Sequence, residues 1–486
     1  MSYPAYTKAV ISYIEANITD EKLSIDKLEQ QIGLSGAHIR ALFRQQTGYS
    51  IGRYTKMRKI KRSALDLLHT DRTILDIAFQ YGFVNPETYT RAFRRAIGMT
   101  PSEFRRQRPL VGKEELLPGI YGVGILAKKE RRSDIGTKQK IYRNNDSTIL
   151  YGVPKVGYGE YGGLTPYPLC LKANANYLGE DLPYYYIMVS CGAAFRFAWN
   201  SRGWDLSNVD IYHTFEESSE VYSLAAKALG REFFFLGRDK GVTKEDFMNF
   251  IKQHLDEGYP CIALGIIGPP EPCIITGYRK NGQELLGWNF FQAGPEFGGS
   301  VKVDDSGYFI SDTWWENTDT QAVMCMGAIK GGPFAQEIII QNGIKALTGR
   351  MDSGFYKGTS AYDGWKKAIA DEKSFSVGEN YYLLFEKMLC QMEAMNCLED
   401  GRSCAAAYFE SLSEAEQDKK EQYHLIANAF HRCKQAIKEI RQLFGTEPDE
   451  MLKKLADKAV RKQVMLLIDR AKEADIEALN LMKGNM

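Results

Sequence analysis

Polar side chains at helical spacing between residues 85 and 97 are the strongest chemical signal in this chain of 486 residues. The outer face of the helix predicted there carries Glu87, Thr88, Arg91, Arg94 and Arg95. An arginine can donate two parallel hydrogen bonds to a guanine edge, and the other polar types contact further base edges or phosphate oxygens. These residues therefore predict a helix that reads the major groove of double-stranded DNA.

Local capping signals define the helices that would hold this face. Thr73 can cap a first helix with Asp76 in its first turn, and Gly82 can end that helix because glycine takes a left-handed conformation at low cost. Asn85 can then cap the second helix, with Pro86 at its first position. The inward positions of the second helix are Tyr89, Phe93 and Ile97. Together these features predict a helix-turn-helix.

The same pattern occurs once earlier, within residues 24–48. Ser24 and Ser35 are its predicted caps and Gly33 is its turn, while Leu42 and Phe43 are core positions. The outward residues of its second helix are Ala37, His38, Arg40, Ala41 and Arg44. Two units about 50 residues apart suit neighbouring major-groove segments, roughly 34 Å apart. The helix predicted between the units would bring three basic side chains to phosphates: Arg58, Lys61 and Arg62.

Residues 8–108 resemble the AraC-type DNA-binding domain in length, in the order of their elements, and in the segments FRQQTG and AFRRAIGMTPSEFRR. The resemblance implies a bacterial transcription regulator that binds double-stranded promoter DNA and contacts RNA polymerase. It also implies that five of the outward residues read bases: Arg40, Ala41, Glu87, Thr88 and Arg91. Arg40 and Arg91 are the sharpest of these, because arginine can pair with guanine through two hydrogen bonds.

The distribution of charge agrees with DNA binding by this part of the chain. Residues 1–110 contain 18 Lys and Arg but only 10 Asp and Glu, whereas the whole chain has a net charge of +1. The positive excess is thus concentrated where phosphates would lie, and the remainder is acidic. The sequence has neither a membrane-spanning apolar run nor a signal peptide, so it predicts a cytoplasmic protein without a membrane partner.

Cysteine and histidine usage gives no metal signal. The 9 cysteines form no CxxC pair, and the 6 histidines are dispersed along the chain. Reduced thiols are therefore expected, with no bound metal and no cofactor.

Composition and periodicity predict a multidomain protein. An all-α tandem helix-turn-helix domain occupies residues 1–109, and a linker with one or two short strands occupies residues 110–150. Residues 151–333 show helical patterns followed by buried strands, which is an α+β arrangement. Residues 334–486 are predicted to be helical throughout, with helices at 334–348, 359–371, 377–397, 400–412, 414–443 and 448–482.

The order of elements in residues 151–333 resembles the papain-like fold of the bacteriocin-processing cysteine peptidases and of the BtrH-type acyltransferases. Cys170 opens a helix, where this family places its nucleophile, and the strand CIITGYRKNGQELLGWN resembles the one that begins with the catalytic histidine. Pro272 or Cys273 stands at that histidine position. Because a cysteine without an adjacent base loses its activation, the resemblance implies a catalytically silent domain whose cleft binds a ligand.

Aromatic residues and one carboxylate supply the rest of the predicted ligand pocket. The candidate ligand-binding residues are Cys170, Trp199, Trp204, Glu271, Cys273 and Trp288. Aromatic walls with a carboxylate suit an apolar or cationic small-molecule effector. Packing in the protein core is the alternative role for each Trp, and Glu271, between two prolines, could equally be an exposed loop residue.

The sequence as a whole predicts a one-component transcription regulator and not an enzyme. One alternative is a cysteine-dependent amidase, peptidase or acyltransferase fused to a DNA-binding module. Another is a scaffold whose C-terminal region recruits a protein partner. An apolar stripe in the last helices could cap the middle domain, contact the inducer or form a homodimer; it comprises Leu452, Leu455, Val460, Val464, Leu467 and Ile468.

Overall fold

The computed structural model divides the chain into two compact units, which are described separately. The described part of the first consists of residues up to 107 together with 291, 292 and 301, and that of the second comprises residues 140–290 and 302–484. The residues that the structure describes are 10, 13, 14, 17–19, 39, 43, 51–70, 72–83, 85–97, 100–107, 140–292, 301–375, 381–445 and 447–484. No described helix is both long enough and apolar enough to cross a bilayer.

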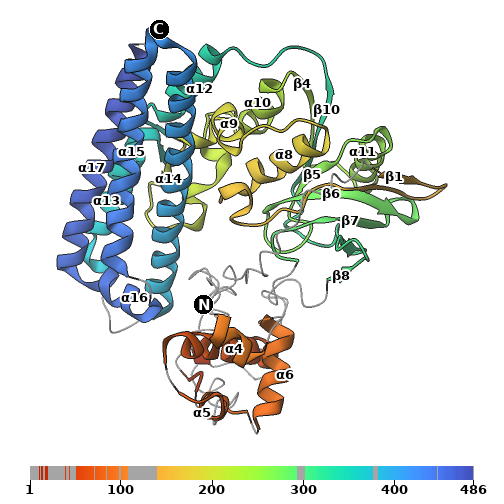
Figure 1. The fold of residues 1–486 in the computed structure, drawn as a ribbon, viewed down its shortest axis with the longest axis vertical. Helices are drawn as coiled ribbons and strands as arrows, with labels where there is room; N and C mark the ends of the chain where they lie inside the picture. Colours follow the sequence, from red (N-terminus) through yellow and green to blue (C-terminus); the bar gives the residue numbers. More distant parts are fainter. Residues whose placement is uncertain are drawn as a thin grey trace. The chain divides into compact units, whose positions relative to one another are not determined.

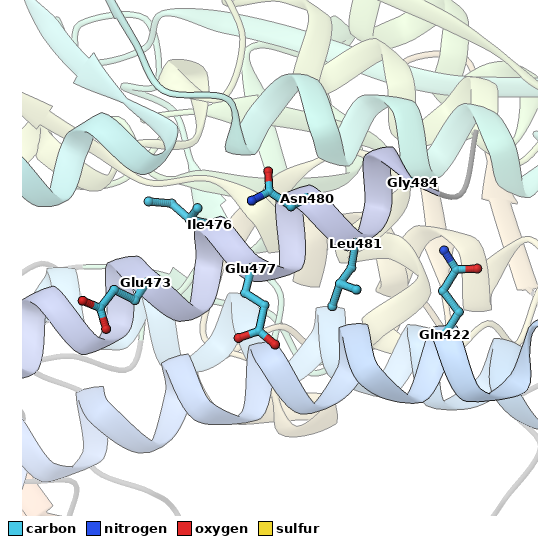
Figure 2. A pocket seen from close by; sticks show the side chains of 7 residues that line it. All are labelled: Gln422, Glu473, Ile476, Glu477, Asn480, Leu481 and Gly484. Carbon is cyan, nitrogen blue, oxygen red and sulfur yellow. The ribbon is translucent and has the colours of Figure 1, made fainter.

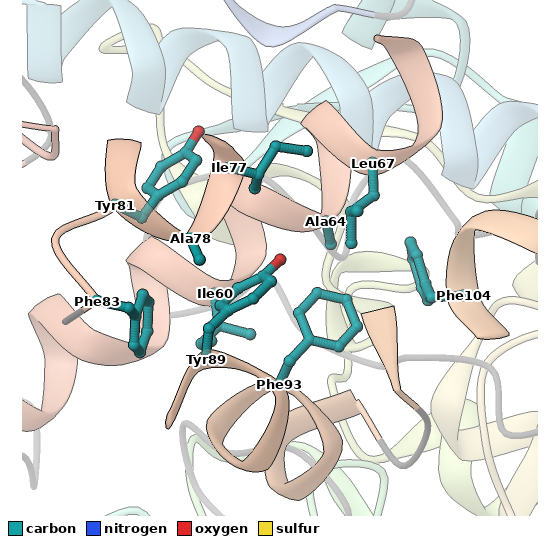
Figure 3. Packing of buried hydrophobic residues seen from close by; sticks show 10 residues of the cluster. All are labelled: Ile60, Ala64, Leu67, Ile77, Ala78, Tyr81, Phe83, Tyr89, Phe93 and Phe104. Carbon is teal, nitrogen blue, oxygen red and sulfur yellow. The ribbon is translucent and has the colours of Figure 1, made fainter. Parts of the chain in front are cut away.

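Four helices pack around one core in the first unit. They are α4 (Ile51–His69), α5 (Ile74–Gln80), α6 (Pro86–Ile97) and α7 (Pro101–Gln107). Figure 3 shows the aromatic centre of this core, where Tyr89 and Phe93 from α6 meet Phe104 from α7. The Phe93 and Phe104 rings meet edge to face with centroids 5.3 Å apart, the geometry that aromatic quadrupoles favour.

A nine-stranded antiparallel sheet forms one part of the second unit. Its main order is β4-β10-β5-β6-β7-β9-β8, and the β1–β2 hairpin joins it where β2 pairs with β6. The strands are β1 (Lys140–Arg143), β2 (Thr148–Tyr151), β4 (Arg231–Gly237), β5 (Cys261–Leu264), β6 (Pro272–Arg279), β7 (Glu284–Trp288), β8 (Lys302–Val303), β9 (Phe309–Ser311) and β10 (Ala322–Ile329).

Short helices cover the sheet, and long helices form a separate bundle beside them (Figure 1). Helix α8 (Pro166–Tyr177) packs on β6 and on α9 (Tyr184–Ser190), α10 (Glu220–Ala228) packs on β4, and α11 (Lys244–Glu257) packs on β2, β5, β6 and β10. The bundle comprises α12 (Gln336–Leu347), α13 (Ala361–Ala370), α14 (Tyr381–Ala415), α15 (Lys420–Phe444), α16 (Pro448–Ala456) and α17 (Lys458–Lys483).

The prediction that residues 334–486 are entirely helical is wrong. Strands β11 (Arg350–Asp352) and β12 (Phe355–Lys357) form a hairpin, and β12 pairs with β3 (Ala198–Asn200). The multidomain architecture, with helical regions and a separate antiparallel sheet, is confirmed. The papain-like assignment and the domain boundaries at residues 109, 150 and 333 stay predictions.

Two helix boundaries in the bundle also differ from the prediction. The helices predicted at 377–397 and 400–412 are one continuous helix, α14, within which Gly401 packs closely against another segment. A Cβ atom at Gly401 would lie 2.7 Å from the carbonyl oxygen of Ala194. The helix predicted at 448–482 is instead divided at Asp457, whose side chain accepts a hydrogen bond from the Ala459 amide and caps α17.

The apolar stripe of the last helices packs inside the second unit. Leu452, Leu455, Val464 and Ile468 are all buried, while the exposed leucine of α17 is Leu466. Because α16 and α17 pack mainly on α12, α13, α14 and α15, these four side chains lie in the core of the bundle and are not available to a second copy of the chain. The role of covering the α+β part stays a prediction.

Candidate functional site

The turn between α5 and α6 is fixed by the residues that the sequence singled out. Thr73 and Asp76 form a reciprocal capping box at the start of α5. Gly82 has a φ of +71°, and the amide of Phe83 donates to the carbonyl of Ala78 at 3.0 Å, as in a Schellman ending. Asn85 caps α6 by accepting from the Thr88 amide at 2.8 Å. The predicted caps and turn are confirmed.

The packing of α6 leaves one face in the core and the other in solvent. Tyr89 and Phe93 are fully buried, and the Tyr89 hydroxyl donates to Ser63 Oγ at 2.9 Å. On the opposite face Glu87, Arg91 and Arg94 are exposed and Thr88 is half-buried. Arg95 lies on the same helix, but its side chain is outside the described set, as is that of Ile97. The polar face therefore stands on a rigid platform.

One predicted phosphate contact is wrong. The Arg58 side chain is fully buried, so it cannot reach a phosphate on the surface. Arg105 of α7 has a structural role that the sequence did not indicate, because its guanidinium donates to the carbonyls of Leu67 and Thr70 at the end of α4.

The earlier helix-turn-helix falls mostly outside the residues that the structure describes. Its predicted DNA-binding residues all belong to the part left undescribed, both the base-reading Arg40 and Ala41 and the outward residues Ala37, His38 and Arg44. Two of its residues, Ile39 and Phe43, are described and buried, and the burial of Phe43 agrees with its predicted core position.

In the second unit, Cys170 and Cys273 are close enough for their thiols to interact electrostatically. Both side chains are completely buried, and burial raises the pKa of each thiol, to about 12 for Cys273. The side chain of Asn289 hydrogen-bonds the Cys273 thiol. The described residues near Cys170 thus offer a second thiol and the carboxylate of Glu271, and no histidine lies on β6.

Helix α14 holds the start of α8 in place. The Asp400 carboxylate accepts hydrogen bonds from Thr165 Oγ1 at 2.7 Å, from the Leu164 amide at 3.1 Å and from the Tyr184 hydroxyl at 3.0 Å. Thr165 is the residue before α8. The bundle therefore positions the helix that carries Cys170.

Glu271 belongs to a group of carboxylates that the sequence did not reveal. Asp210 and Glu393 both act on Glu271 through repulsion, and Arg196 opposes them with its positive charge. Burial, reinforced by that repulsion, raises the pKa of Glu271 to about 8. Burial also raises the pKa of Asp210 to about 6, although Tyr212 donates a hydrogen bond to it. Three acidic groups from distant segments therefore share one partly desolvated region.

The predicted tryptophans lie in two other places. Trp199 packs against Trp204 and Trp365, with ring centroids 5.4 and 6.0 Å away, in a cluster between β3 and α13. Trp288 pairs with Ile274 across β6 and β7, so it faces the opposite side of the sheet from Cys273. Its indole donates to the carbonyl of Val153 at 2.9 Å. The structure brings Cys170, Cys273 and Glu271 together and separates the three tryptophans from them.

A groove of about 440 Å³ lies elsewhere, between α15 and α17 (Figure 2). Gln422 of α15 lines it together with α17 residues that include Glu473, Ile476 and Asn480. None of the predicted ligand-binding residues contributes to this groove.

Comparison with known proteins identifies the first unit. A family model described as a helix-turn-helix domain matches residues 28–107. The right origin-binding protein of Escherichia coli is 36% identical over 106 residues, which are 22% of this chain and 36% of that protein. The regulatory protein SoxS of Salmonella typhimurium is 34% identical over 107 residues, and the match covers 99% of its length.

A solved AraC-type transcriptional regulator from Chromobacterium violaceum covers 22% of this chain and 96% of its own, with 28% identity and a TM-score of 0.21. The chain spans about a third of the length of the origin-binding relatives but nearly all of SoxS, a regulator that consists of little more than the matched domain. By that full-length match, the chain belongs to the AraC family of helix-turn-helix transcription regulators.

Proposed function

We propose that this protein is a one-component transcription regulator that binds double-stranded promoter DNA and responds to a cationic small molecule bound in its second unit. The observation that carries the DNA-binding part is the exposed polar face of α6, held by caps at both ends of the turn and by a fully buried opposite face. A preorganised recognition helix loses little conformational entropy when it enters the major groove.

The residues assigned to DNA are those of the two outward faces. Arg91 is the principal base-reading residue of α6, with Glu87 and Thr88 beside it, and Arg94 and Arg95 serve the phosphate backbone. In the earlier helix-turn-helix, Arg40 and Ala41 read bases, flanked by Ala37, His38 and Arg44. Support for this assignment comes from family membership together with the exposure of Glu87, Arg91 and Arg94.

The effector site is the carboxylate region around Glu271. Three acidic groups in a partly desolvated place repel one another, and a bound cation would relieve that repulsion. Tyr212, which is 37% exposed and hydrogen-bonded to Asp210, offers an aromatic ring to such a cation. An organic amine or a quaternary ammonium ion fits this chemistry better than a neutral apolar molecule.

The site is not catalytic in this proposal. The papain-like resemblance pairs the Cys170 position with a histidine, but here the corresponding group is the Cys273 thiol, which cannot act as a base while its pKa is about 12. The raised pKa of Cys170 leaves it a thiol, and only the thiolate is a good nucleophile. These observations favour a ligand-binding relative over a cysteine-dependent enzyme.

Effector binding would alter transcription by shifting the balance between two conformations of the chain. A coupling of about 1–3 kcal/mol changes DNA occupancy by about 5- to 150-fold. RNA polymerase is the protein partner proposed for the DNA-bound state. Leu75 and Phe79 of α5, which are 45% and 50% exposed, are available for such a contact. Homodimer formation is part of the proposal only if DNA binding proves to require two chains.

The DNA-binding part is tested with the full chain and a site obtained by selection from random duplexes. Arg91→Ala is expected to weaken binding to the selected site by about 1–3 kcal/mol while leaving binding to random DNA nearly unchanged. Arg470→Ala is the control, since Arg470 pairs with Glu439 on the surface of the other unit. Equal losses on both DNAs would mark Arg91 as a phosphate contact and contradict its assigned role.

The effector part is tested by thermal shift of the full chain against amines, quaternary ammonium ions and their neutral analogues. Cations should raise the melting temperature of the wild type but not that of Glu271→Gln, because a ligand stabilises only the state that binds it. Trp288→Ala is the control, since Trp288 faces away from Cys273. A cation that stabilises wild type and Glu271→Gln equally would place the effector elsewhere.

A further inference from the structure

Three buried side chains from α11, β5 and β10 come together in the second unit. His254 lies on α11, Cys261 begins β5, and Cys325 lies on β10 directly opposite Cys261 in the strand register. The imidazole and the two Sγ atoms offer ligand atoms that all lie within 4.8 Å of one another. The cluster was not predictable from the sequence, because the two cysteines are 64 positions apart.

The hydrogen bonding of His254 leaves one ring nitrogen available. Nδ1 lies 2.8 Å from the carbonyl oxygen of Phe250, and a carbonyl can only accept, so Nδ1 carries the proton. In the neutral ring Nε2 then holds a lone pair. Nε2 is buried and has no hydrogen-bond partner, in a side chain that is only 3% exposed. A backbone carbonyl that fixes the tautomer in this way is the usual outer partner of a metal-binding histidine.

The surroundings of the cluster also suit a cation. Phe250 and Phe234 pack on the imidazole with ring centroids 4.4 and 4.8 Å away, which fixes the ring orientation. Phe234 is 37% exposed, so a single layer of side chains separates the cluster from solvent. The carboxylate of Glu257, one turn after His254 on α11, acts electrostatically on Cys325.

We propose that His254 Nε2, Cys261 Sγ and Cys325 Sγ form a metal site for a thiophilic d¹⁰ cation, Zn²⁺ or Cu⁺. Two thiolates and one imidazole are the ligand set that these cations prefer, whereas Mg²⁺ and Ca²⁺ require oxygen ligands. On binding, two sulfur–metal bonds and one nitrogen–metal bond form, and the two thiol protons pass to the buffer. The metal would join α11 to β5 and β10.

The test uses the full chain, reduced, stripped with a chelator and then loaded with Zn²⁺ alone or with Cu⁺ alone. One equivalent of metal per chain is expected to remain after desalting, as measured by elemental mass spectrometry. Co²⁺ should give a thiolate charge-transfer band of the intensity expected for two sulfurs. Retention of Zn²⁺ indicates a fourth ligand in the loaded site, and retention of Cu⁺ alone indicates a three-coordinate site.

Matched variants separate this site from the other thiols. Loss of a residue that only hydrogen-bonds a metal ligand lowers metal affinity by up to about 100-fold. Cys325→Ala and His254→Phe each remove a ligand itself, so each should weaken metal binding by more than that. Cys191→Ala, which removes a buried thiol that donates to the Met188 carbonyl, should leave one equivalent bound. The metal-free circular dichroism spectra of all variants are compared with that of the stripped wild type.

The Co²⁺ spectrum tests the proposal even if a variant fails to fold, because it is recorded on the wild-type chain. The proposal is overturned if the wild type retains neither cation and gives no thiolate band. It is equally overturned if Cys325→Ala retains the metal as the wild type does, or if Cys261 and Cys325 form a disulfide and the chain binds no metal in the reduced form.

Discussion

The Arg402 guanidinium and the Asp475 carboxylate form an ion pair 2.6 Å long in which neither side chain is exposed. Arg402 also donates to the backbone carbonyls of Ala194 and Arg196, at 2.8 and 3.2 Å. The Tyr362 hydroxyl donates to Asp475 at 2.7 Å. One buried pair therefore ties α14 and α17 to the segment that carries Arg196, the cation of the Glu271 region.

Arg402→Met should destabilise the second unit strongly. The substitution leaves the Asp475 charge buried without its partner, which typically costs about 3–5 kcal/mol. Arg470→Ala, which breaks an exposed pair with Glu439, should cost about 0–1 kcal/mol. Urea unfolding of both variants, followed by tryptophan fluorescence, checks the comparison. Similar midpoints for the two variants would show that the buried pair is not important for stability.

Gly401→Ala should also destabilise the second unit, although alanine is the better helix former by about 1 kcal/mol. The added Cβ would lie 2.7 Å from the Ala194 carbonyl oxygen, and a backbone atom cannot move away cheaply. The same substitution at Gly52 in α4, where a Cβ meets nothing within 4 Å, should leave its unit as stable or slightly more stable. Melting curves of each variant decide between propensity and packing as the dominant effect.

Cys170 should be unreactive in the native chain. Its thiol is completely buried, and burial holds its pKa well above the ordinary value for cysteine, so very little thiolate forms at neutral pH. Iodoacetamide at pH 8 should leave Cys170 unlabelled during an incubation in which the urea-denatured chain labels completely. Peptide mass mapping gives the result. Rapid, selective labelling of Cys170 would instead favour the cysteine-dependent enzyme.

Binding of a quaternary ammonium ion should become tighter as the pH rises from 6 to 8. Such an ion keeps its charge at every pH, so any dependence reports protein groups. Glu271, with a pKa of about 8 caused mainly by burial, ionises over this range, and only the ionised form attracts the cation. Affinity should rise by at most about tenfold per pH unit for each proton released and then level off. Calorimetric titrations should show a much smaller rise for Glu271→Gln.

The same pKa predicts how stability without ligand depends on pH. A glutamate in the unfolded chain ionises near pH 4.5, whereas Glu271 in the folded chain keeps its proton until about pH 8. The folded state therefore binds more protons between these values, and the free energy of unfolding falls as the pH rises through them. Glu271→Gln should lessen this fall. An unchanged pH dependence in the variant would mean that Glu271 ionises normally.

Local signals made the turn between α5 and α6 predictable. A Thr–Asp capping box, a glycine in the left-handed region and an Asn–Pro start each depend on neighbours within a few residues. The carboxylate region was only partly predictable, because Glu271 meets Asp210 and Glu393 through tertiary folding across more than 60 and 120 residues. The role of Gly401 was not predictable, because it depends on close approach to the backbone of Ala194, more than 200 residues earlier in the chain.

The pairing of β12 with β3 delays folding of the second unit during synthesis, because the two strands are far apart in the chain. Helices α4, α5, α6 and α7 share one core and all lie before residue 108, but β3 meets its partner only after residue 357, and Arg402 meets Asp475 later still. Translation proceeds at about 5–20 residues per second, so the delay between the two units is about 20–75 s. A nascent chain therefore holds the complete core of its helix-turn-helix on the ribosome well before the second unit has been made.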